Sequence, residues 1–425
     1  MALSGQQGAR DAGNGQGVGN APEFGAERGI GRLTLADPLA AEPRIPGPVP
    51  APRPDEKWDL PDGFAWVYYA ENGSDITKPV IMADAFSLGR SDLGRLYQGL
   101  ETGFPFLSGL RHRGRTVILL GFDERSASLM DNANAAITAV QRTIAEQRDH
   151  TRLTVGGFGT GGLVTRYALA KLEHTGADHC TGLYFSYDSP HRGGVVPLAL
   201  QAFAHFIPGP ENDLARQLNS PAARQTLWRH YDGETGAVRP DPEREKFLDA
   251  LGRFGHWPQL PRTIAVANGA GNGRGLPVPP GDLALKINGP VFPGTALYTQ
   301  GAGDGVRVAD LKRLLPPAAQ RITTDGLPEL DGAPGGTLDA YRLLAERLDA
   351  HGAETDLRHP TVCAVPSVSA VAIRDLDRHD DLYADIASLP PEQSELDEFH
   401  CSATNTGHTA LTRELCTWIM DRLPV

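Results

Sequence analysis

Glycine recurs through the stretch VGGFGTGGLVTRYAL, residues 155–169, with spacings that suit two kinds of chemistry. Gly157, Gly159 and Gly162 satisfy GxGxxG, in which backbone amides at a strand-to-helix turn bind the phosphates of a dinucleotide. The same residues also fit the nucleophile elbow GxSxGG, with glycine at the apex in place of serine. Both motifs need glycines because neighbouring backbones approach closely at such a turn.

The context of this stretch favours the elbow. A dinucleotide fingerprint normally opens the first strand-helix-strand unit and is followed after about 20 residues by an acidic side chain for the ribose. Here two apolar strands are predicted ahead of the motif, and the next acidic strand end, Asp188, follows Gly157 by 31 residues. The elbow interpretation makes Gly159 the apex, and the first amides of the next helix would supply half of an oxyanion hole.

Longer segments carry a resemblance to a known fold family. They are KPVIMADAF, LLGFDERSASLMDNA, VGGFGTGGLVTRYALAKLEH and LYFSYDSPHRGG, with fainter similarity at VPSVSA (365–370) and NTGHTAL (405–411). From Pro79 to Phe206 the chain resembles the lipase and esterase branch of the α/β-hydrolase fold. That resemblance implies a serine nucleophile where this chain has Gly159. Thr160 also replaces a methionine, and Ala85 a glycine, so three changes together favour natural divergence over an engineered knockout.

The resemblance implies roles for other residues. His408, ahead of the predicted terminal helix, matches the catalytic base, and Asp304 resembles the acid turn of many lipases. Asp188 and Asp377 remain alternative acids because they lie at or soon after predicted strand ends. The donors of the oxyanion hole and the substrate contacts are expected among Asp84, Ala85, Phe86 and Thr160.

Without a serine, three functions stay open. The first is a repurposed enzyme in which His408 removes a proton in a non-covalent cyclisation, elimination or isomerisation, or assists attack by water. Its substrate would be a hydrophobic small molecule such as a polyketide or terpenoid intermediate. The second is an esterase, lipase or acyltransferase inactivated by a Ser-to-Gly change at position 159. The third is a non-catalytic protein that binds ligands in the old pocket. Thr160 is a poor substitute nucleophile because it lies one residue beyond the apex.

Apolar runs of strand length alternate with helical patterns, which predicts an α/β fold with a mostly parallel sheet and helices on both faces. A crossover helix is predicted over 132–147, and residues 194–260 are expected to form a helical cap. Residues 1–55 are predicted to be a disordered Gly/Pro-rich tail and linker, and 56–425 the α/β-hydrolase domain. Little regular structure is predicted over 270–340. The predicted strands are 79–85, 116–122, 152–158, 182–188, 262–268 and 361–368.

Composition narrows the classes of molecule that the chain is expected to bind. The chain of 425 residues has a formal net charge of −12 and no basic block, which argues against a nucleic-acid partner. Its four cysteines lie far apart without a CxxC pair, so free thiols are predicted, with no metal and no cofactor. No apolar run is long enough for a membrane span, and no secretory leader is apparent, so a cytoplasmic location is expected. The oligomeric state is left open.

Overall fold

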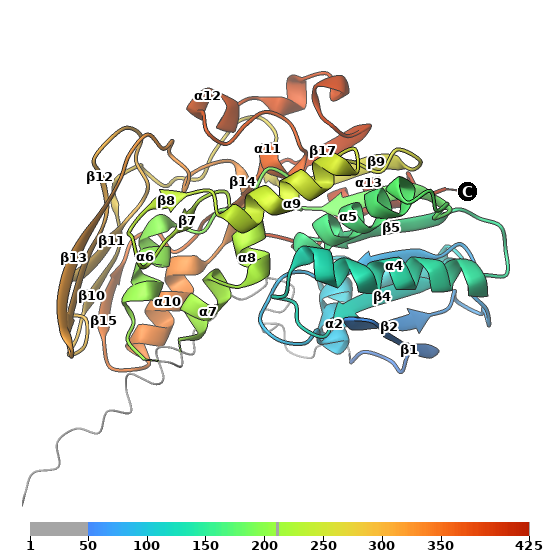
Figure 1. Cartoon of the computed structure of the whole chain (residues 1–425), viewed down its shortest axis with the longest axis horizontal. Coiled ribbons are helices and arrows are strands. Elements are labelled where there is room, and N and C mark those ends of the chain that lie inside the picture. Colours follow the sequence, from blue (N-terminus) through green and yellow to red (C-terminus); the bar gives the residue numbers. More distant parts are fainter. Residues whose placement is uncertain (1–49, 210–211, 425) are drawn as a thin grey trace, which may run out of the picture.

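The computed structural model describes residues 50–209 and 212–424, and its largest element is an eight-stranded sheet (Figure 1). The strands lie in the order β1-β2-β4-β3-β5-β6-β9-β17. The first two form an antiparallel hairpin, β2 pairs antiparallel with β4, and all later neighbours are parallel. Their bounds are β1 Glu56–Leu60, β2 Gly63–Tyr68, β3 Val80–Ala83, β4 Val117–Phe122, β5 Leu153–Phe158, β6 Thr181–Tyr187, β9 Arg262–Ala270 and β17 Glu398–Ser402.

Helices cover both faces of this central sheet, which explains its continuous apolar strands. Every residue of β3, β4 and β5 is buried. Because successive side chains point to opposite faces, Ile118 and Leu120 belong to one hydrophobic cluster, and Val117 and Leu119 to the other. The first cluster includes α4 (Leu129–Glu146) and α5 (Thr160–His174), and the second includes α2 (Leu93–Thr102), α3 (Phe106–His112) and α13 (Arg413–Met420). The crossover helix predicted over 132–147 lies within α4, apart from its last residue.

The last strand of the central sheet differs from the prediction. Residues 361–368 contain β16 (Val362–Pro366), which pairs antiparallel with β14 (Gly335–Leu338) in a separate two-stranded sheet. The central sheet instead ends at β17, whose sequence is EFHCS and whose residues are mostly half-buried. An edge strand packs less completely than an inner strand, so this segment lacks the apolar run that identified the others.

A second sheet has four of its five strands in the region, 270–340, where little regular structure was predicted. It is antiparallel, with the order β13-β12-β11-β10-β15. One face of an antiparallel sheet can remain in water, so its strands need only alternate apolar residues, and the glycines of the intervening turns hid this weak signal. The strands are β10 Leu283–Asn288, β11 Thr295–Tyr298, β12 Val306–Leu314, β13 Pro317–Thr324 and β15 Glu354–Leu357, and α10 (Ala340–Asp349) packs beside β15.

The described part of the predicted cap region, 194–209 and 212–260, contains four helices and one short hairpin. The first helix, α6, packs on the second sheet, where Phe203 and Phe206 contact Phe292. Figure 1 shows α9 running across the junction between the two sheets. The elements are α6 Leu198–Phe206, α7 Asp213–Leu218, α8 Pro221–Thr226, β7 His230–Tyr231, β8 Val238–Arg239 and α9 Pro242–Arg253; further along the chain follow the short helices α11 Ser367–Ala370 and α12 His379–Leu382 and the 3-10 turns Ile386–Ser388 and Pro391–Gln393.

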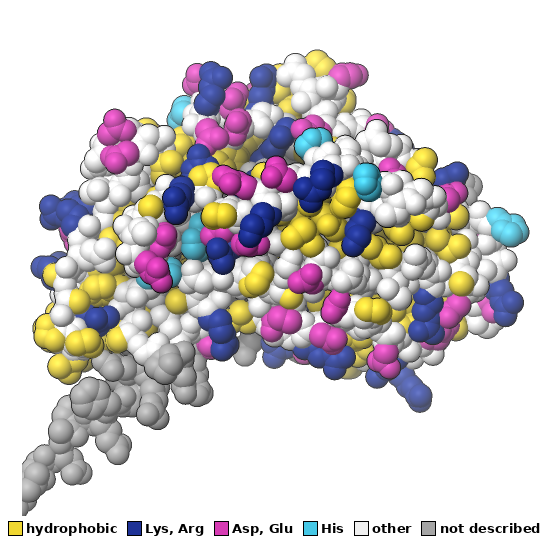
Figure 2. All heavy atoms as spheres, viewed as in Figure 1, with side chains coloured by type: hydrophobic (Ala, Val, Ile, Leu, Met, Phe, Trp, Pro, Cys, Tyr) yellow, Lys and Arg dark blue, Asp and Glu magenta, His cyan; other side chains and the backbone are white. Residues whose placement is uncertain are grey.

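Most of the predicted tail, residues 1–49, lies outside the described residues. On the face shown in Figure 2, acidic and basic side chains are interspersed rather than gathered in single-sign patches. Within residues 50–209 and 212–424, no helix is long and apolar enough to cross a membrane.

Candidate active site

The turn between β5 and α5 places Gly159 in a conformation that side chains disfavour. Its backbone has φ 50° and ψ −122°, with φ in the region that L-residues rarely adopt. Close packing fixes the flanking residues as glycine too. A Cβ atom at Gly161 would lie 2.4 Å from the carbonyl oxygen of Asp84, and one at Gly162 would lie 2.1 Å from Oγ of Ser189. The turn therefore holds the apex tightly while adding no side chain there.

A histidine and a carboxylate meet next to this apex. His408 lies on the loop between β17 and α13, and its Nδ1 is 2.7 Å from Oδ2 of Asp188. Asp188 directly follows β6, is fully buried, and accepts a second hydrogen bond at Oδ1 from the amide of Asn268. A proton on Nδ1 can therefore be donated to the carboxylate, which leaves the lone pair on Nε2 as the basic atom.

The basic nitrogen faces the vacant position at the apex. A Cβ atom added to Gly159 would lie 3.0 Å from Nε2 of His408 and 3.5 Å from Cβ of Ala85. A serine at this position would therefore present its hydroxyl beside the histidine. In the present chain the same space is open to a bound molecule.

The loop that carries His408 is fixed by backbone and side-chain hydrogen bonds. The backbone amide of His408 donates to the carbonyl oxygen of Thr337 in β14 at 2.8 Å. The side-chain amide of Asn268 donates to Oγ1 of Thr406 and to the carbonyl oxygen of Ala410, at 2.9 and 2.8 Å. Bonds on both sides of the histidine position its ring without any contribution from residue 159.

The predicted oxyanion donors are only partly available. The Ala85 amide donates to Oδ1 of Asp84 at 2.8 Å, so this bond already occupies one expected donor. Asp84 is buried, with Oδ2 3.7 Å from Nη1 of Arg125. The amide of Thr160 lies in the first turn of α5, where backbone donors have no acceptor within the helix. Phe86 and Thr160 line the cavity that contains His408.

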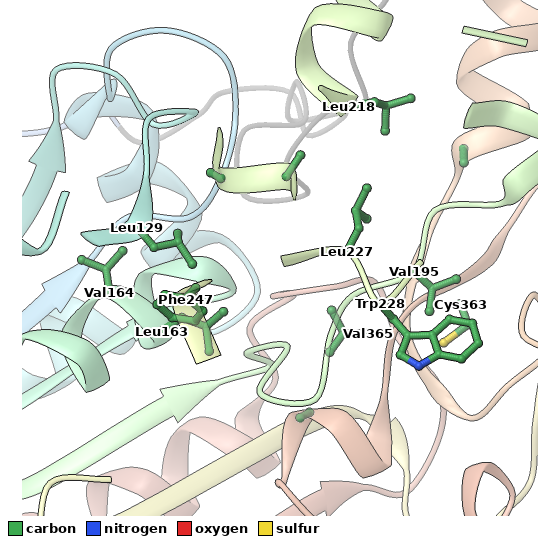
Figure 3. Close-up of a cluster of buried hydrophobic side chains, with 14 of the residues drawn as sticks. Leu129, Leu163, Val164, Val195, Leu218, Leu227, Trp228, Phe247, Cys363 and Val365 are labelled. Carbon is green, nitrogen blue, oxygen red and sulfur yellow. The ribbon is translucent and has the colours of Figure 1, made fainter. Parts of the chain in front are cut away.

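That cavity has a volume of about 120 Å³ and mostly apolar walls. The predicted cap region contributes Leu218 from α7 and Leu227 after α8, and β16 contributes Val365. In Figure 3, Leu227 and Val365 lie beside Val195, and Leu218 lies above them, on one side of a larger hydrophobic cluster. The full lining is Ala85, Phe86, Thr160, Pro190, Gly194, Val195, Val196, Gln217, Leu218, Ala223, Thr226, Leu227, Leu338, Ala364, Val365 and His408.

The other acid candidates lie elsewhere. Asp304 occupies an exposed turn ahead of β12 in the second sheet and is not bonded to His408. Asp377 forms an ion pair with Arg229. Of the three aspartates that the sequence left open, the structure brings only Asp188 to the histidine.

Two structural residues of the site were not anticipated. A Cβ atom at Gly336 in β14 would lie only 1.9 Å from Oδ2 of Asp188. Asn268, near the C-terminal end of β9, donates hydrogen bonds to Asp188 and to the loop that carries His408. The GG pair at 335–336 was a visible signal, but its meaning depends on the distant carboxylate that packs against it.

The cysteines are poorly suited to act as nucleophiles. All four cysteines are free. Burial, and then the charge of Asp188, raises the pKa of Cys401 to about 12 and that of Cys363 well above its ordinary value. A thiol with so high a pKa carries little thiolate at neutral pH and is a weak nucleophile. Among the described residues, no group of three or more His, Cys, Asp or Glu side chains could hold a metal ion.

The strand order, the helices on both faces and the turn at Gly159 give the α/β-hydrolase fold. No protein-family model matches the chain, and no curated protein matches it. Among solved structures, esterase Est22 is similar at 14% identity and a TM-score of 0.33, over 50% of this chain and 62% of that one. A Pyrobaculum calidifontis esterase is similar at 13% identity and a TM-score of 0.31, over 50% of this chain and 65% of that one. The mature Bacillus licheniformis lipase BlEst2 is similar at 11% identity and a TM-score of 0.31, over 48% of this chain and 72% of that one. The chain therefore matches less than two thirds of the two esterases.

Proposed function

We propose that this protein is an enzyme in which His408, oriented by Asp188, acts as a general base on a small molecule with an apolar group. The reaction is a non-covalent cyclisation, elimination or isomerisation. The observation that carries the proposal is the position of Nε2 of His408, 3.0 Å from where a Cβ of residue 159 would lie. The substrate takes the space that a nucleophile would otherwise fill.

The chemistry follows from the protonation of the histidine. Asp188 holds the proton on Nδ1, so Nε2 accepts a proton from a substrate hydroxyl or from a C–H beside a carbonyl. The negative charge then develops on the substrate oxygen, and the amide of Thr160 at the start of α5 can donate to it. Return of the proton from Nε2 to another substrate atom completes the step and regenerates the base.

The cavity sets a limit on the bound group. Its volume of about 120 Å³ is smaller than the roughly 300–1,000 Å³ of a common ligand pocket. This volume equals that of about four water molecules in the liquid, at about 30 Å³ each. A substrate as large as a polyketide or terpenoid intermediate would therefore place only part of itself in this cavity and extend beyond it.

One observation favours a second candidate, an esterase scaffold that lacks only its nucleophile. The apex keeps the strained backbone of a nucleophile elbow, and it keeps a histidine within reach of a side chain. On this alternative, Gly159→Ser gives strong ester hydrolysis. A non-catalytic binding protein predicts activity in neither form.

The test uses 5-nitrobenzisoxazole, from which a base removes one C–H proton as the N–O bond breaks. We expect the unmodified protein to catalyse ring opening. In His408→Ala the rate of ring opening should fall at least tenfold. The matched control is His400→Ala, which breaks a similar pair on the sheet edge, with Nε2 of His400 3.0 Å from Oε1 of Glu414. An equal rate in all three proteins contradicts the proposal.

A parallel assay separates the alternatives. Hydrolysis of a chain-length series of p-nitrophenyl esters is measured for the protein, Gly159→Ser, and Gly159→Ser/His408→Ala. Strong His408-dependent turnover by the serine variant, without ring opening by the original protein, selects the esterase scaffold. No turnover of either probe by folded proteins selects the binding role.

A further inference from the structure

A second cavity lies beside the candidate active site and shares no lining residue with it. Its volume is about 520 Å³, and Arg166, Arg192 and Trp257 are among its walls. We call it the Arg166 cavity. The chain connects the two spaces directly: Pro190 lines the cavity of His408, and the next residue, His191, lines the Arg166 cavity.

Arg166 is a buried cation whose hydrogen-bond partners are both neutral groups. Its residue is 5% exposed. Nε donates to the carbonyl oxygen of His256 at 2.7 Å, Nη1 lies 3.4 Å from Nδ1 of His191, and the guanidinium stacks 3.5 Å above the ring of Trp257. Among the described residues, Nη2 has no hydrogen-bond partner. This nitrogen is a donor left for a ligand in the cavity.

The neighbouring histidine does not supply a counter-charge. Burial, followed by the charges of Arg166 and Arg192, lowers the pKa of His191 well below its ordinary value. Nε2 of this histidine lies 2.8 Å from Oγ of Ser186. Because Nδ1 faces the guanidinium as an acceptor, the proton resides on Nε2, and the ring is neutral.

The one carboxylate nearby is already engaged. Oε1 of Glu395 lies 3.1 Å from Nη2 of Arg192, and Oε2 accepts from Nε1 of Trp257 at 2.8 Å. The cavity thus holds two guanidiniums and one carboxylate. Burial lowers the pKa of Arg166 to about 10, which still leaves it charged at neutral pH. Glu395 also raises the pKa of Arg166, but this carboxylate is bound to Arg192 and Trp257, so it serves two guanidiniums at once. An anion in the cavity would balance the second buried charge.

We infer that the Arg166 cavity binds the oxyanion of a small ligand, a carboxylate or a phosphate, through the unpartnered nitrogen of Arg166 and the guanidinium of Arg192. Planar guanidiniums match the oxygen geometry of both groups. The exposed fraction of the Arg192 side chain is 35%, so it lies at the mouth of the site, while Arg166 forms its floor. This site is independent of the reaction proposed for His408.

The test is calorimetric titration of the full chain with sodium phosphate and with sodium acetate, at ionic strength held constant with sodium chloride. We expect saturable binding of at least one anion, weakened at least tenfold in Arg166→Gln and also weakened in Arg192→Gln. The matched control is Arg422→Gln, because Arg422 also stacks on a tryptophan, 3.7 Å above Trp418, but bonds Glu398 at 2.7 Å. Its binding should equal that of the original protein.

Further variants keep the inference open to contradiction. His408→Ala should bind the anion unchanged, which separates this site from the active-site cavity. If Arg166→Gln does not fold, Arg192→Gln carries the test, and unchanged binding by that variant overturns the inference. So does the absence of saturable binding by the original protein at concentrations of either salt up to about tenfold above a Kd of roughly 1 mM. Preference for acetate or for phosphate identifies the ligand group.

Discussion

Oδ2 of Asp188 lies where a side chain at position 336 would begin, because a Cβ atom on Gly336 would be 1.9 Å from it. The carboxylate that orients His408 is thus packed directly against the backbone of β14. This contact joins the chemistry of the central sheet to the small sheet formed by β14 and β16, and it makes a glycine far from the apex part of the site.

Gly336→Ala should therefore displace Asp188. We expect a loss of about 1–3 kcal/mol in the free energy of unfolding, as for other overpacked sites, and a lower rate of His408-dependent ring opening. Urea denaturation and the ring-opening assay measure the two effects. Gly407→Ala is the control, since its Cβ would meet only Ala410, at 3.7 Å. Equal losses in both variants would remove the special role of Gly336.

Asp188→Asn should reduce general-base activity without unfolding the protein. An amide can still accept from the amide of Asn268, but it can donate to Nδ1 of His408 and so favour the wrong tautomer. We expect kcat/KM to fall by about a hundredfold or more. Asp304→Asn, at the other candidate acid, should leave kcat/KM unchanged, and a comparable loss there would reassign the acid.

Gly159→Ala should fill the space assigned to the substrate. The added Cβ would lie 3.0 Å from Nε2 of His408, and the positive φ costs about 1–3 kcal/mol for a residue other than glycine. We expect lower thermal stability and slower ring opening. Gly194→Ala adds a methyl group to the same cavity where the nearest atom is 3.6 Å away, and it should change stability less. Unaltered ring opening by Gly159→Ala would place the substrate elsewhere.

Asp331 should make stability depend on pH. It is buried, its Oδ2 accepts from the amide of Gln300, and burial raises its pKa to about 6. The folded state therefore binds more protons than the unfolded state between the ordinary carboxyl pKa, about 4, and pH 6. Its contribution is fully present below about pH 4 and is lost as pH rises through 6.

Relative to Asp331→Asn, the original protein should lose stability by about 1–3 kcal/mol between pH 4 and pH 7.5. Urea unfolding of both proteins across this range measures the difference, with Asp304→Asn as an exposed control. A pH-independent difference between the original protein and Asp331→Asn would mean that Asp331 titrates normally in the folded state.

Sequence patterns predicted the parts of the fold that are buried on both sides. Strands β3, β4 and β5 appeared as uninterrupted apolar runs, whereas β17 lies at a sheet edge and β13 is mostly exposed, so neither has such a run. Glycine spacing located the turn at Gly159 because backbone contacts there leave no room for side chains.

The carboxylate that pairs with His408 could not be predicted from the sequence. Asp188 and His408 are separated by 220 residues, and nothing local distinguishes Asp188 from Asp304. Only the parallel pairing of β6 with β9 brings the end of β6 to Asn268 and the histidine loop. The same distance in sequence hid the steric requirement at Gly336.

The bonds that hold His408 have a consequence for how such a site can change over generations. Thr337 and Asn268 hold the histidine loop, Asn268 also holds Asp188, and both residues belong to strands of the sheets. The side chain at position 159 takes no part in that support. The residue at the apex can therefore change without removing the bonds that hold His408 and Asp188 in place.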